Sequence, residues 1–136
     1  MLMTPIYHFN YSLEIESMKK LTKLKALELS SKMWHEIAKK GYCSKSEYFI
    51  SNNIPYRERP LYASYLCQYV KVKVGELNCR FCPVIWGGKG IHFCFCKRIY
   101  SPYETWVRNP TSANALKVAK LIDKYWKIAK RCKKQK

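Results

Sequence analysis

The chain has 136 residues, and its 26 lysine and arginine residues against 9 acidic ones give a formal net charge of +17. This length allows one modest domain but not two independently stable ones. An apolar content of 48%, with 15% aromatic residues, excludes an intrinsically disordered chain. No stretch approaches the roughly 18 uninterrupted apolar residues of a membrane span, and the first residues lack the pattern of a secretory signal. We therefore expect a cytoplasmic protein.

Three segments are expected from the distribution of charge and apolar residues. Residues 1–16 lack a clean period and predict an irregular arm. Residues 17–130 predict a single domain, and residues 131–136 form a basic tail.

The first half of the domain predicts two helices. Apolar residues recur at helical spacing from Ser17 to about Lys40, and Gly41 stands where a left-handed C-cap is expected. Ser44 and Glu47 then have the spacing of a capping box, which predicts a short helix through about Ser51.

Two strands are expected in the middle of the chain. Val70, Val72 and Val74 alternate with lysines, a period of two that predicts a half-buried strand. A second candidate strand runs over residues 91–99, after a glycine-rich turn. The pair predicts a β-hairpin.

The last third returns to helical signals. Ser101, Pro102 and Glu104 combine an N-cap, a proline at the first helical position and an acidic third residue, which predicts a short helix carrying Trp106. A final amphipathic helix is expected from about residue 113 to residue 130, capped by Thr111 or Ser112.

Four of the seven cysteines predict a metal centre. Cys79 and Cys82 have the Cys-x2-Cys spacing that lets two thiolates of one tight turn bind a tetrahedral zinc ion. Cys67 lies twelve residues before this turn and Cys94 lies twelve after it, so these two complete the set, with Cys96 as the alternative fourth ligand. Such a closed site leaves no position for water, and we therefore expect a structural zinc ion and no catalytic activity.

Other interpretations of the cysteines stay open. An iron–sulfur cluster uses the same ligands, and His92 is a possible fourth ligand in a Cys3His site. A thioredoxin-like redox pair is disfavoured because no helix start follows the turn. Buried apolar thiols are the remaining alternative, and we assign Cys43 and Cys132 to it.

The excess of positive charge indicates a polyanionic partner, either DNA or RNA, because lysine and arginine that neutralise phosphates release bound counterions. The competing explanation is composition, since 20 of the 26 basic residues are lysine, as an AT-rich genome would produce. The candidate nucleic-acid contacts are Lys89, Lys97, Arg98, Lys117, Lys120, Lys124, Lys127, Lys130 and Arg131. The nearby aromatic residues predict either a stacking surface or, more in keeping with a small domain, part of its core.

Several weak motifs follow one another in a fixed order between Lys32 and Trp126. They are Met33-Trp34 with Ile37-Ala38, Lys45-x-Glu47-Tyr48, Tyr65-Leu66-Cys67-Gln68-Tyr69, Cys79-x2-Cys82-Pro83-Val84-x-Trp86, a late cysteine, and Tyr103-x2-Trp106. This order resembles a group of small zinc-binding proteins of unassigned function that tailed bacteriophages and prophages encode. The resemblance implies a phage origin, the cytoplasm of a bacterial host and a structural metal, but no activity. The chain departs from the group where Ser64 replaces a cysteine and Gln68 replaces an acidic residue.

Together these observations predict an α+β fold in which a small zinc-knuckle and β-hairpin element packs against an N-terminal and a C-terminal amphipathic helix. Two functions fit it. The first is a nucleic-acid-binding accessory factor without catalytic activity. The second is a host-interaction or anti-defence protein that acts by binding another protein. We expect no membrane and no small-molecule substrate as partners.

Overall fold

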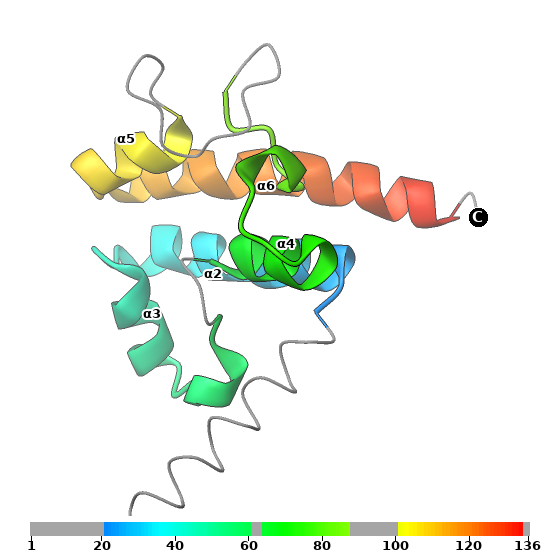
Figure 1. The fold of residues 1–136 in the computed structure, drawn as a ribbon. Helices are drawn as coiled ribbons and strands as arrows, with labels where there is room; N and C mark the ends of the chain where they lie inside the picture. The colour runs from blue at the N-terminus through cyan, green and yellow to red at the C-terminus, as the bar shows by residue number, and fades with distance from the viewer. Residues whose placement is uncertain (1–20, 61–63, 88–100, 135–136) are drawn as a thin grey trace, which may run out of the picture.

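A computed structural model describes residues 21–60, 64–87 and 101–134, which form helices and connecting turns without a β-sheet (Figure 1). The described elements are α2 (Lys23–Lys40), α3 (Lys45–Ser51), η1 (Tyr56–Glu58), α4 (Tyr65–Val74), η2 (Cys79–Phe81), α5 (Pro102–Arg108) and α6 (Ser112–Lys134), where η marks a 3-10 helix.

The α+β prediction is wrong for this part of the chain, because the expected first strand is helix α4. The Ser64 hydroxyl accepts a hydrogen bond from the backbone N–H of Cys67 at 3.1 Å, which caps the first turn. Gly75 ends the helix with a left-handed φ of 91°. Leu66 and Val70, one helical turn apart, are both buried, so the alternation of valine and lysine is incidental. The second candidate strand, residues 91–99, lies outside the described residues.

Local capping signals were read correctly at three other helix ends. Gly41 ends α2 with a φ of 73°. The hydroxyls of Ser44 and Ser101 cap α3 and α5 by accepting from the backbone N–H of Glu47 at 3.2 Å and of Glu104 at 3.1 Å. The start of α2 was misplaced, since the helix begins after Thr22 and not at Ser17.

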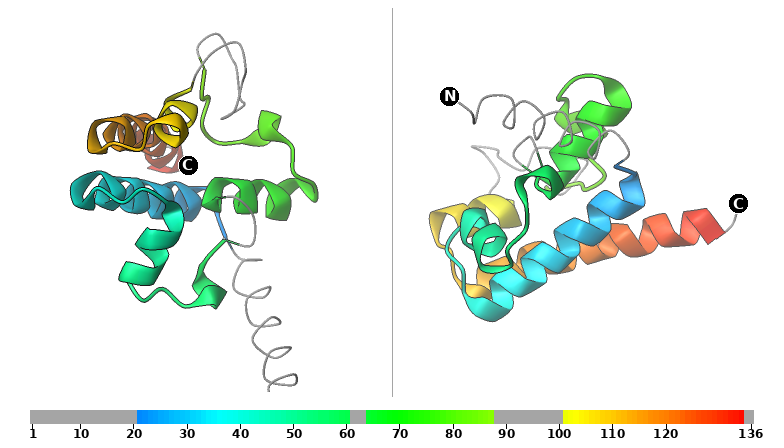
Figure 2. Two further views of the ribbon diagram at one scale, coloured as in Figure 1. Left: turned by 90° about the vertical axis from the view of Figure 1, so that its left-hand side faces the viewer. Right: turned by 90° about the horizontal axis from the view of Figure 1, so that it is seen from below.

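Helix α6 is longer than expected and packs along α2. Thr111 accepts from the backbone N–H of Asn114 at 3.2 Å at its start, and the helix continues to Lys134 instead of ending at residue 130. Figures 1 and 2 show that α2 and α6 run side by side in opposite directions, and that the C-terminal end of α6 extends past the start of α2.

The core lies between α6, α2 and the shorter helices α4 and α5. Leu27, Ile37 and Ile122 are completely buried where α2 faces α6. The Trp34 and Trp106 rings meet edge to face, with their centroids 4.7 Å apart, and join α2 to α5. These aromatic contacts close one end of the two-helix layer. No helix in the described ranges is both long and apolar enough to cross a membrane.

Candidate functional site

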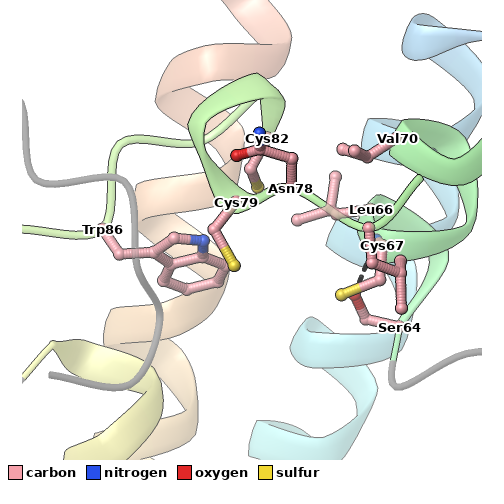
Figure 3. Close-up of a pocket in the computed structure, with 9 residues that line it drawn as sticks. Ser64, Leu66, Cys67, Val70, Asn78, Cys79, Cys82 and Trp86 are labelled. Atoms are coloured by element: carbon pink, nitrogen blue, oxygen red, sulfur yellow. Dashed lines mark hydrogen bonds between the residues drawn. The ribbon is translucent and has the colours of Figure 1, made fainter. Parts of the chain in front are cut away.

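Three of the predicted metal ligands line one pocket between α4 and η2 (Figure 3). Cys67 comes from the first turn of α4, and Cys79 and Cys82 come from η2 and the residue after it. The pocket has a volume of about 140 Å³. Its walls are formed by Ser64, Leu66, Cys67, Val70, Leu77, Asn78, Cys79, Cys82 and Trp86.

The geometry of this pocket contradicts the zinc prediction. Within residues 21–60, 64–87 and 101–134, no three histidine, cysteine, aspartate or glutamate side chains come close enough together to hold a metal ion. Desolvation raises the pKa of the Cys79 thiol above its ordinary value of 9.0, and the nearby Cys67 raises it further. Both effects favour the neutral thiol in the metal-free protein. The strand that was expected to carry Cys67 is helix α4, and the expected fourth ligand, Cys94 or its alternative Cys96, lies outside the described residues.

Other predicted residues lie elsewhere. Cys94, its alternative Cys96 and His92 fall outside the described residues, and so do the basic residues Lys89, Lys97 and Arg98. Cys43 and Cys132 take no part in the pocket, and their assignment to buried apolar thiols is wrong, because both are exposed. The aromatic residues Trp86 and Trp106 are buried, which assigns them to the core instead of a stacking surface.

A row of basic side chains runs along α6. It consists of Lys117, Lys120, Lys124, Lys127 and Arg131, all exposed, and is called here the α6 basic stripe. At 3.6 residues per turn these positions fall within an arc of about 80°. The buried side chains of the same helix, Ala115, Val118, Ala119, Ile122 and Ala129, occupy the opposite side. The stripe therefore faces away from the protein.

Lys130 does not belong to the stripe. Lys130 lies about 60° around the helix from Lys127, the nearest member of the stripe. Its ammonium lies 3.9 Å from the centroid of the Trp126 ring, a cation–π contact. Lys120, Lys124, Lys127 and Arg131 instead border one shallow depression on α6, together with Asp123 and Ile128. Five of the six basic residues predicted on this helix thus share one surface.

Asp123, the only acidic residue of α6, is engaged by α2. The Ser31 hydroxyl donates to its Oδ1 at 2.5 Å, and His35 Nε2 lies 2.6 Å from its Oδ2. These residue types occur in hydrolase triads, but here the carboxylate separates the hydroxyl from the imidazole, so His35 cannot take a proton from Ser31. We interpret the group as a polar bridge between two helices.

Sequence reasoning missed this bridge. Its partners are separated by 92 and 88 residues along the chain. The available signals were a serine and a histidine four residues apart on the first helix and a lone acidic residue on the last one.

No protein-family model, curated protein or solved structure matches the chain.

Proposed function

We propose that the protein is a nucleic-acid-binding accessory factor that contacts phosphates through the α6 basic stripe and performs no chemistry on its partner. The observation that carries this proposal is the gathering of five exposed cations on the side of α6 that faces away from the core. Together they present a continuous positive surface to which a polyanion can bind.

The stripe brings no obvious benefit to the fold. Its members are three or four residues apart, a spacing at which like charges destabilise a helix by about 0.2–0.5 kcal/mol per pair. The helix dipole favours cations only near the C-terminus, yet Lys117 and Lys120 lie in the first half of α6. A bound polyanion would turn this repulsion into attraction.

The one carboxylate beside the stripe is held by other groups. The two carboxylate oxygens of Asp123 contact Ser31 and His35 of α2, and among the described residues no ion pair joins it to a lysine of the stripe. This arrangement leaves the positive charge of the stripe available to phosphates.

A matched pair of variants tests the proposal with a fluorescently labelled oligonucleotide at about 50 mM salt, where phosphate contacts are strong. The stripe variant is Lys120→Gln/Lys124→Gln/Lys127→Gln. The control variant, Lys23→Gln/Lys39→Gln/Lys40→Gln, removes the same charge from the exposed ends of α2. Far-UV circular dichroism checks that both variants are folded.

We expect the wild type and the control variant to bind with similar affinity, and the stripe variant to bind at least about tenfold more weakly. Absence of binding by the wild type would refute the proposal. Equal losses in the two variants would show that only the overall charge of the protein matters, which would also count against a defined site on α6.

A second candidate function, binding to another protein, is favoured by one observation. Val74, Leu77 and Phe81 are exposed between the end of α4 and η2, at 37%, 55% and 54% of their surface. Exposed apolar side chains that lie together are a feature of protein interfaces. If no oligonucleotide binds, this surface becomes the better candidate, and a Phe81→Ser variant tests it by pull-down from a bacterial host lysate.

A further inference from the structure

The shape of the stripe also bears on which kind of nucleic acid it binds. We infer that the partner is double-stranded DNA, contacted along its phosphate backbone without sequence preference. This inference rests on the proposed function, and three features of α6 carry it: the rigidity of the stripe, the absence of aromatic side chains from the side of α6 that bears it, and the predominance of lysine among its members.

The stripe is straight and rigid. It lies on one uninterrupted helix of 23 residues, and the distance along the axis from Lys117 to Arg131 is about 21 Å at 1.5 Å per residue. One cation therefore occurs about every 5 Å. Duplex DNA is a stiff rod that carries one charge per about 1.7 Å of its axis. Two straight arrays of opposite charge can align along their length with little loss of conformational freedom.

Proteins that bind single strands usually gain part of their affinity from base stacking. Proteins that hold them combine basic grooves with aromatic rings on which bases stack, worth about 1–3 kcal/mol per base. The side chains that flank the stripe are Leu116 and Ile128, which are aliphatic and partly exposed. The aromatic residues of α6, Tyr125 and Trp126, pack toward the core, and a lysine lies over each ring, at 5.5 and 3.9 Å from the centroid. Both rings are only partly buried, but they lie about 120° and 140° around the helix from the centre of the stripe. Neither ring therefore belongs to the surface that the stripe presents.

The composition of the stripe favours phosphate contacts over sequence readout. Arginine and lysine can both read guanine, but Arg131 is the single arginine of the stripe, and asparagine and glutamine, which pair with adenine, are absent from it. Lysines on flexible stems suit phosphates, which position a protein without specifying sequence. Contacts of this kind predict similar affinity for unrelated sequences.

The diameter of an α-helix matches the major groove of a DNA duplex but not that of an RNA duplex. An α-helix with its side chains is about 10–12 Å across, and the major groove of B-form DNA is about 12 Å wide. The major groove of A-form RNA is deep and narrow and does not admit side chains in this way. The stripe lies on the side of α6 opposite the residues that are buried against the core, and the C-terminal end of α6 extends past the start of α2 (Figure 2). The stripe is therefore not covered by α2.

A comparison of three probes with the full-length protein tests the inference. They are a DNA duplex of about 20 base pairs, one of its strands without self-complementarity, and the RNA duplex of the same sequence. The logarithm of the binding constant falls with the logarithm of the salt concentration, by about 0.9 per phosphate contact for duplex DNA and by about 0.7 for single-stranded DNA. If the two affinities converge at about 1 M salt, five contacts predict that the DNA duplex binds about 20-fold tighter than the single strand at 50 mM salt. A duplex of unrelated sequence should bind within about twofold of the first, because phosphate contacts do not discriminate between bases.

The outcomes separate this inference from the proposed function. If the single strand or the RNA duplex binds as tightly as the DNA duplex, and the stripe variant weakens that binding, the inference is wrong while the proposed function stands. If no probe binds, both are wrong. A large preference for one duplex sequence would also overturn the inference, because it would show that base contacts and not phosphate contacts dominate the binding.

Discussion

Substitution of Asp123 by alanine tests the polar bridge that joins α2 to α6. The change leaves the Ser31 hydroxyl without its partner, and Ser31 is only 4% exposed. An unsatisfied buried hydroxyl costs about 1–3 kcal/mol. The contact with His35 adds at most about 1 kcal/mol, because its side chain is 46% exposed and solvent screens the interaction. We therefore expect Asp123→Ala to lower the free energy of unfolding by about 2 kcal/mol.

A double-mutant cycle separates this bridge from a general effect of the substitution. Removal of both partners of a buried hydrogen bond is less costly than removal of one. The Ser31→Ala/Asp123→Ala protein should therefore lose less stability than the two single losses added together, with a coupling of about 1 kcal/mol. Urea unfolding followed by tryptophan fluorescence measures all four proteins. Losses that add to within about 0.3 kcal/mol would refute the bridge.

Three further predictions concern α4 and the pocket beside it. Gly75→Ala should lower the stability by about 1 kcal/mol in urea unfolding, because the residue has a φ of 91° and caps α4; a neutral result would contradict the helical assignment of residues 65–74. Burial raises the pKa of Tyr65 above its ordinary value of 10.0, so the unfolded chain ionises first and stability should be intact below about pH 10 and fall above it. Tyr65→Phe should reduce this alkaline loss, whereas Tyr56→Phe, at an exposed tyrosine, should not. The raised pKa of Cys79 predicts slower alkylation by iodoacetamide near neutral pH than at the exposed Cys132, as measured by mass spectrometry; faster reaction at Cys79 would contradict it.

The sequence was most informative where the structure is set locally. The caps at Gly41, Ser44 and Ser101 follow from side chains that bond to the backbone a few residues away, and short-range patterns record such bonds. The helical period of the last helix likewise predicts that five lysines lie outside its apolar side, and all five are exposed: Lys117, Lys120, Lys124, Lys127 and Lys130. These features depend little on the rest of the fold.

The errors arose where the pattern was short or the contact distant. Five alternating residues, Val70 to Val74, fit a strand as well as a helix. The N-cap role of Ser64 was not predicted, because this position was interpreted only as the place where the resembled group has a cysteine. Cys67, Cys79 and Cys82, which the spacing predicts as ligands of one metal ion, line one pocket. Spacing could not predict that helix α4 would hold Cys67 in a position that completes no metal site within the described residues.

The most direct test of the central claim is the salt dependence of duplex binding for the wild type and the stripe variant. Five phosphate contacts predict a slope of about −4.5 for the logarithm of affinity against the logarithm of salt concentration. Removal of Lys120, Lys124 and Lys127 predicts a slope shallower by about 2.7. The same slope in both proteins would show that these side chains do not contact phosphates, and would contradict the account of α6 as the nucleic-acid-binding element.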